Sequence, residues 1–236
     1  IITYWGNVKN CPRPTEDQEI LKTLKKVAEV KFFDIKNFDM KKLIEGANAS
    51  DLFLFHAQIP TQDEVTQMLM VERIQVVLRS IKCKKALWFM EKVWMGKADI
   101  LDHLLADVDY AFLTDETFTR RIKEPKVFSL HPASPIKSLR GKIKPELVCD
   151  IAYVGQMYGI RPREYDFLKE NLGEAIKFYD NKFGQDLADL CRSAKIILTT
   201  RFTFDDFYWS DRIYTHLYMW ALVIHKRTQG LKDEGF

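Results

Sequence analysis

Short apolar runs alternate with amphipathic helical stretches along nearly the whole chain, and this alternation constrains the fold more than any other feature. The first group of apolar runs is expected to form strands at residues 1–5, 30–35, 51–56, 85–90, 110–113 and 126–130. Helices are expected between them at 16–30, 40–46, 63–80 and 98–106. Alternation of this kind is typical of a mostly parallel sheet with helices on both faces.

A stretch without periodicity, residues 131–149, interrupts this alternation. It is rich in proline and lysine, which is typical of an interdomain linker. The alternation then restarts, with strands expected at 150–154, 175–179, 195–200 and 221–225 and helices at 164–171, 184–193 and 210–219. We therefore predict an α/β protein of two Rossmann-like domains, 1–130 and 150–236, which face each other across a cleft. Ligands are expected at the carboxyl ends of the strands.

Composition excludes several classes of protein. The chain has 236 residues, of which 47% are hydrophobic and 29% charged, so it is not disordered, collagen-like or a coiled coil. The longest apolar run, Leu217–Ile224, is far shorter than the roughly 18 residues of a membrane span. The cysteines form no CxxC motif and no Cys/His cluster with zinc spacing. We expect a reduced, cytoplasmic protein with no transmembrane segment, no metal site and no bound cofactor.

Cationic residues concentrate between Arg120 and Lys144, where Glu124 is the only acid. Such a stretch can attract phosphates. It can equally be a solvated linker whose lysines confer solubility. The charge keeps nucleic acid among the partners to consider without arguing strongly for it.

A glycine-containing turn follows the strand expected at 150–154. Gly155 and Gly159 lie in this turn, and glycines there let backbone N–H groups approach a phosphate. Arg161 and Arg163 follow closely, and a guanidinium group can bind two phosphate oxygens. The spacing is not GxGxxG, and the alternative is a tight turn with surface arginines.

A second candidate segment begins the helix expected at 210–219. Ser210 is a good N-cap, and Asp211 in the first turn opposes the helix dipole. The free N–H groups of this helix, together with Arg212, could hold a diphosphate, and Trp209 or Tyr208 could stack on a nucleotide base. The alternative is a well-capped core helix with inward-facing aromatic residues. A third segment, 229–231, follows the last strand at the same edge of the sheet.

From residue 150 onward the sequence resembles the second half of GT-B glycosyltransferases, in particular the CgeB-like (spore maturation protein) branch of the group 1 glycosyltransferases. The matching stretches are DIAYVG, KIILTT, YWSDRIY, ALVIHK and QGLKDEGF. The first half also fits, through KALWFMEK, DVDYAFLTDE and VFSLHPAS. The resemblance covers most of the chain and implies a GT-B fold. The second domain is short for this family, so we expect either a minimal version or a tail beyond Phe236.

The resemblance implies transfer of a hexose or pentose from a nucleotide-sugar donor to a hydroxyl acceptor, without a metal ion. The donor would lie mainly in the second domain and the acceptor in the first. The acceptor itself is left open among a glycan, a lipid-linked glycan, a protein and a modified DNA base. The predicted donor-binding residues, with Trp209 added from the motif above, are Gly155, Tyr158, Arg161, Arg163, Trp209, Ser210, Asp211, Arg212, Gly230 and Leu231.

Two departures from the family pattern motivate an alternative function. Thr215 stands where related enzymes usually carry a glutamate that binds the ribose hydroxyls. Tyr218, Met219 and Trp220 stand where those enzymes have small residues and a glycine. The alternative is a non-catalytic protein of the same fold that binds a nucleotide or a sugar phosphate.

Candidates for a catalytic base lie in the first domain. His56 ends the strand expected at 51–56, where an imidazole could face an acceptor hydroxyl. Glu91 follows the next strand along the chain and is a comparable candidate. The alternative for His56 is an ordinary hydrogen-bonded histidine. His131 and His225 rank below these two.

Overall fold

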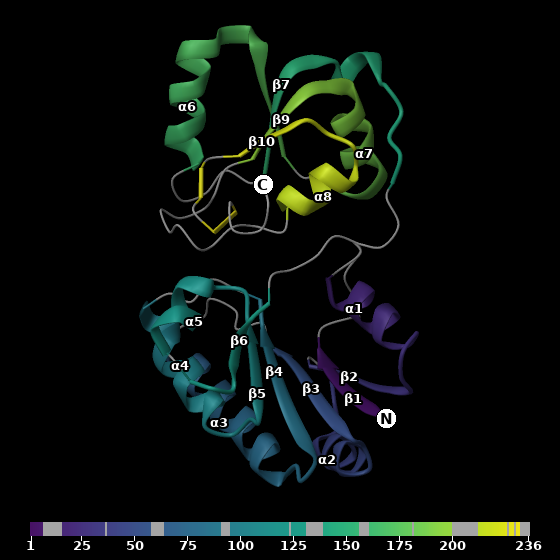
Figure 1. Ribbon diagram of the computed structural model, residues 1–236, viewed down its shortest axis with the longest axis vertical. Coiled ribbons are helices and arrows are strands. Elements are labelled where there is room, and N and C mark those ends of the chain that lie inside the picture. Colours follow the sequence, from purple (N-terminus) through teal and green to yellow (C-terminus); the bar gives the residue numbers. More distant parts are fainter. Residues whose placement is uncertain are drawn as a thin grey trace. The chain divides into compact units, whose positions relative to one another are not determined.

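The computed structural model of the chain describes residues 1–6, 16–35, 37–57, 64–90, 95–122, 124–130, 139–155, 161–180, 182–199, 212–225, 227–228 and 230–231. The chain divides into two compact units, Ile1–His131 and Pro132–Phe236. Each unit contains one sheet whose strand pairs are all parallel (Figure 1). The α/β class with two parallel sheets, as predicted, is therefore confirmed.

The sheet of the first unit has the strand order β2-β1-β3-β4-β5-β6. Its strands are β1 (Ile2–Gly6), β2 (Val30–Asp34), β3 (Leu52–Ala57), β4 (Lys84–Phe89), β5 (Tyr110–Leu113) and β6 (Val127–Ser129). The helices between them are α1 (Glu16–Leu24), α2 (Met40–Asn48), α3 (Glu64–Ser80), α4 (Met95–Leu105) and α5 (Glu116–Ile122).

Alternating side chains of these strands form the two faces of the first sheet. Leu87 and Phe89 of β4 belong to the larger core, which includes buried side chains of α2, α3 and α4. Ala86 belongs to a smaller cluster on the other face, where Leu21 of α1 packs. Figure 1 shows α1 apart from α3, α4 and α5, on the opposite side of the sheet. Both faces are covered because a parallel sheet of this kind must bury both.

The helix α5 was not expected from the sequence. It is only seven residues long, and none of its residues is fully buried. The Asp115 carboxylate precedes it and accepts a hydrogen bond from the Phe118 N–H at 3.3 Å. A helix this short gives little hydrophobic periodicity, so its side-chain cap carries most of the signal.

The sheet of the second unit has the strand order β10-β9-β7-β8. Its strands are β7 (Cys149–Val154), β8 (Ile176–Tyr179), β9 (Ala194–Thr199) and β10 (Val223–His225). Its helices are α6 (Arg161–Leu172), α7 (Gly184–Ser193) and α8 (Arg212–Tyr218), with 3-10 turns η1 (Pro145–Leu147) and η2 (Gly173–Ala175).

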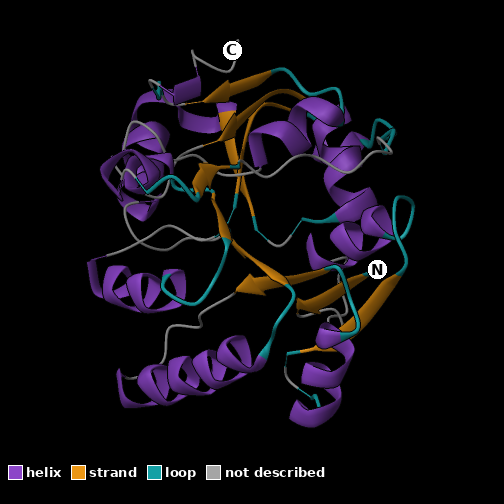
Figure 2. Cartoon of the chain, turned by 60° about the horizontal axis from the view of Figure 1, so that its bottom comes forward, coloured by secondary structure: helices purple, strands orange, loops and turns teal. Residues whose placement is uncertain are grey.

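The second sheet is also flanked by helices on its two faces (Figure 2). Buried residues of α7, such as Leu190, share a core with Ala152 and Ile197 of the sheet. On the other face Tyr153 of β7 packs edge-on against Tyr165 of α6, with ring centroids 5.6 Å apart. No helix in the described part of the chain is both long enough and apolar enough to cross a membrane.

Candidate functional site

The candidate site lies at the carboxyl edge of the second sheet. Its first strand, β7, is central, with β8 on one side and β9 on the other. The connections after β7 and β9 therefore leave the sheet in opposite directions. This is the topological switch point at which open α/β sheets bind ligands. Gly155 directly follows β7, and Thr199 ends β9.

Two arginines reach the backbone of Gly155. A β-carbon placed on residue 155 would lie 2.5 Å from Arg212 Nη1 and 3.7 Å from Arg161 Nη1. The φ angle of Gly155 is +146°, which side chains other than hydrogen rarely allow. Its N–H donates to the Tyr179 carbonyl at 3.1 Å, which ties the turn to β8. A side chain at residue 155 would be strained by this φ angle and would have to displace the Arg212 guanidinium group.

The first turn of α6 supplies one of these arginines. Arg161 is the first residue of α6 and is only 3% exposed, whereas Arg163 in the same turn is exposed. The sequence placed both in the loop before a helix starting near residue 164, so the helix begins a turn earlier than expected. A buried arginine at a helix N-terminus favours an anionic ligand.

The helix α8 supplies the other arginine. Arg212 is its first described residue, and Ile213 beside it is buried against Leu231 and Val223. One turn later His216 is 1% exposed. Burial, followed by the nearby Arg212 charge, lowers the pKa of His216 to about 4. The imidazole is therefore neutral at physiological pH and adds no charge of its own to this edge.

Two buried polar atoms, one on β9 and one on α8, lack a hydrogen-bond partner among the described residues. Within the described part of the chain, neither Thr199 Oγ1 nor His216 Nδ1 makes a hydrogen bond. Their residues are 4% and 1% exposed. Buried polar groups are normally hydrogen-bonded, so unpaired ones indicate a place for a small polar ligand or an ordered water. Neither residue was predicted from the sequence, where a threonine that ends an apolar strand was the only signal.

Some of the predicted donor-binding residues therefore lie close together, and others lie outside the described residues. Gly155, Arg161 and Arg212 converge on one point. Leu231, which follows the buried Gly230, packs against Ile213 of α8. Several predicted residues lie outside the described residues, namely Tyr158, Trp209, Ser210, Asp211 and, in the first unit, Glu91.

His56 of the first unit is buried within its strand. The strand β3 continues to Ala57, and the His56 side chain is 1% exposed. Tyr4 Oη lies 3.4 Å from His56 Nδ1, and the His56 and Trp88 ring centroids are 5.9 Å apart. Because β1 and β3 flank the topological switch point of the first sheet, the position suits a ligand. Its role as a catalytic base stays a prediction.

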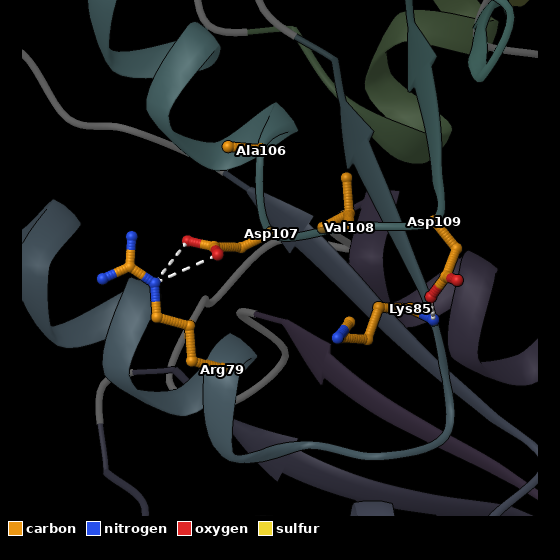
Figure 3. Close-up of a pocket in the computed structure, with 6 residues that line it drawn as sticks. All are labelled: Arg79, Lys85, Ala106, Asp107, Val108 and Asp109. Atoms are coloured by element: carbon orange, nitrogen blue, oxygen red, sulfur yellow. Dashed lines mark hydrogen bonds and ion pairs between the residues drawn. The ribbon is translucent and has the colours of Figure 1, made fainter.

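A surface hollow in the first unit is built from paired charges (Figure 3). Arg79 of α3 donates to Asp107 at 3.0 Å, and the Lys85 N–H donates to Asp109 at 2.9 Å. Although burial opposes it, hydrogen bonds from Lys85 and Lys84 hold the pKa of Asp109 below its usual value. These contacts join α3 to the segment before β5, which makes the hollow a structural feature.

Metal ligands do not gather in the part of the chain that the structure describes. No group of three or more His, Cys, Asp or Glu residues there is arranged to hold a metal ion. Burial raises the pKa of the Cys191 thiol to about 12, so it is not a thiolate ligand at neutral pH.

Comparison with known proteins adds information on the fold. No protein-family model and no curated protein matches the sequence. A crystal structure of an alpha1,3-fucosyltransferase superposes with a TM-score of 0.52, at 11% identity, over 96% of this chain and 68% of that one. Structures described as alpha1,3-fucosyltransferase with GDP-fucose and with GDP give TM-scores of 0.52 and 0.51, each at 12% identity and with the same coverage. The likeness confirms the predicted GT-B-type fold class.

Proposed function

We propose that the chain is a glycosyltransferase that moves a sugar from a nucleotide-diphosphate donor to a hydroxyl acceptor. One observation carries this proposal: Arg161 and Arg212 converge over the backbone of Gly155 at the carboxyl edge of the second sheet. Two guanidinium groups beside a glycine turn match the charge and the shape of a diphosphate.

The arginine pair would act on the leaving group. The acceptor oxygen forms a bond to the anomeric carbon while the bond from that carbon to the diphosphate oxygen breaks. The nucleoside diphosphate leaves with the electron pair, and Arg161 and Arg212 stabilise the charge that develops on it. The acceptor proton passes to a base, for which His56 and Glu91 are the candidates. Because two fixed cations are already present, we propose that no metal ion is needed.

The structural neighbours support the same class of donor. They are glycosyltransferases, and one of the structures is described as holding GDP-fucose and another GDP. For this chain we propose a nucleotide-sugar donor without choosing the base, and a hexosyl or pentosyl group. The CgeB-like resemblance and a cytoplasmic location remain part of the proposal.

A second candidate function is binding without catalysis. It is favoured by Thr215 in the position where related enzymes usually have a glutamate, and by the bulky Tyr218–Trp220 segment. A non-catalytic protein would use the same arginine pair to hold a nucleotide or a sugar phosphate.

A thermal-shift screen with UDP, GDP, ADP and their sugars tests the site. We expect the nucleotides of one nucleobase to raise the Tm of the chain. Arg212→Ala should weaken the binding of that nucleotide roughly 10- to 100-fold, as for a lost charge-assisted contact. The matched control is Arg192→Ala, an exposed arginine of α7 in the same unit. If the nucleotide raised the Tm of Arg212→Ala as much as that of the unmodified chain, the proposed location of the site would be contradicted.

Donor turnover separates the two functions. Hydrolysis or transfer of the stabilising nucleotide-sugar, lost in Arg212→Ala, supports a glycosyltransferase. Binding that depends on Arg212 but gives no turnover with any acceptor class would support the non-catalytic alternative.

A further inference from the structure

An exposed apolar surface lies where α8 ends and β10 begins. Trp220 is 68% exposed and Leu222 65% exposed, and Leu217 and Tyr218 are also exposed. Singly scattered apolar residues are normal on a protein surface, but a group of large ones within six consecutive positions is not. This group marks a place where the protein contacts something other than water.

The backbone of Trp220 is held in an unfavourable conformation. Its φ angle is +66°, and among the described residues it is the one non-glycine residue with positive φ. The Ala221 N–H donates to the His216 carbonyl at 3.1 Å, a bond that closes the end of α8. Glycine usually occupies this position at a helix end, because a side chain there is strained. A bulky indole therefore stands where a helix end favours glycine, which makes this position a candidate for a functional role.

A cationic segment adjoins the indole. The Arg140 guanidinium carbon lies 5.9 Å from the centroid of the Trp220 ring. Lys142 is exposed two residues later, and Ile143 beside it is 64% exposed. No acidic residue occurs in the sequence from Pro125 to Pro145. A cation therefore lies against the exposed indole, and a second cation and an exposed apolar side chain follow it in the same segment.

We propose that this surface docks the protein onto an anionic membrane. We define the membrane-docking surface by Arg140, Lys142, Leu217, Tyr218, Trp220 and Leu222. Tryptophan and tyrosine favour the headgroup region of a bilayer, leucine enters its apolar boundary, and basic residues bind anionic headgroups. A second copy is a poorer occupant, since a two-fold interface would bring the cations of both copies together.

The membrane-docking surface and the arginine pair occupy different positions in the second unit. The membrane-docking surface precedes β10 in the chain, whereas the arginine pair lies at the carboxyl edge of the same sheet. Arg212 begins α8, whereas Leu217 and Tyr218 lie in its last turn. The proposal does not depend on glycosyl transfer.

Vesicle co-sedimentation of the full 236-residue chain tests the proposal. We expect binding to phosphatidylcholine vesicles with about 30% phosphatidylglycerol, weak binding to pure phosphatidylcholine, and loss of binding as salt rises. Arg140→Gln with Lys142→Gln should weaken binding roughly 25-fold, about fivefold for each cation. Trp220→Gly should weaken it roughly tenfold.

The controls separate docking from misfolding and from general charge. Glycine suits the φ angle of residue 220, so Trp220→Gly should keep or raise the Tm. Phe167→Ala removes an aromatic side chain that is 63% exposed elsewhere in the unit, and Lys25→Gln with Lys26→Gln removes two exposed charges from the first unit. Both should bind vesicles as the unmodified chain does.

Three results would overturn the proposal. The first is absent binding, or equal binding to neutral and anionic vesicles. The second is a loss of binding in the control variants as large as in the surface variants. The third is a stable dimer that Trp220→Gly dissociates, without any vesicle binding, which would assign the surface to a second copy.

Discussion

His216 is a neutral histidine placed one helical turn after a cation of the candidate site. It is 1% exposed on α8, and burial together with Arg212 lowers its pKa to about 4. Protonation would place a second charge beside Arg212 in a desolvated position. Because the His216 imidazole is neutral, α8 can pack against the sheet without burying a second charge next to Arg212.

The free energy of unfolding should fall at mildly acidic pH because of His216. Its pKa is about 4 when folded and 6.5 in the reference state, so the unfolded chain binds the proton first as pH falls. This contribution to stability is intact above about pH 6.5 and decreases toward pH 4, by about 2 kcal/mol at pH 5. Urea titrations of the unmodified chain and of His216→Gln, at pH 5 and above pH 6.5, measure this contribution to the free energy of unfolding.

The control for this pH dependence is His103→Gln, which removes an exposed histidine of α4. It should leave the difference in stability between the two pH values as it is in the unmodified chain. An equal pH dependence in His216→Gln and the unmodified chain would show that His216 is not the responsible group.

At the scale of elements, α7 is joined to a segment that the sequence assigned to a linker. Residues 139–144 lie along α7, where the Lys142 N–H donates to Asp189 Oδ1 at 2.8 Å and the Lys144 N–H donates to Ser193 Oγ at 2.9 Å. The Lys142 N–H and then Gln185 lower the pKa of Asp189 below its usual value. Proline and lysine content indicates weak secondary structure, but it does not exclude an extended segment that packs through its backbone.

Gly141→Ala should destabilise the second unit. A β-carbon at residue 141 would lie 1.8 Å from the Ala188 carbonyl oxygen of α7, so the segment must move away from the helix. We expect a loss of about 1–3 kcal/mol, as for other overpacked sites. Lys142→Ala is the matched control, because it keeps the backbone hydrogen bond and removes only an exposed side chain. Equal stability of both variants in urea titrations would contradict the close packing.

At the scale of the whole molecule, each unit has its own sheet and its own buried core. Compact units of this kind can open separately, because few contacts within one core depend on the other. The arginine pair and the membrane-docking surface both belong to the second unit, and His56 belongs to the first.

Leu101→Ala should therefore loosen the first unit and spare the second. Leu101 is fully buried in the first core, and its truncation should cost about 2–5 kcal/mol there. Hydrogen exchange should accelerate in β3 and β4 and stay unchanged in β7 and α8. Equal acceleration in both units would mean that the chain unfolds as one cooperative body.

Hydrophobic periodicity alone determined the two parallel sheets, because burial of alternating or helically spaced residues is a local property of the chain. Which polar residues meet depended on strand order and helix start points. Gly155 and Arg212 are far apart in sequence and come together through β7, β9 and α8, and Arg161 joins them because α6 begins a turn early. The family resemblance indicated these residues, but their convergence and the burial of His216 came only from tertiary packing. The physical reason is that contacts between distant segments depend on the order of the strands in the sheet and on where the helices begin, which no local pattern specifies.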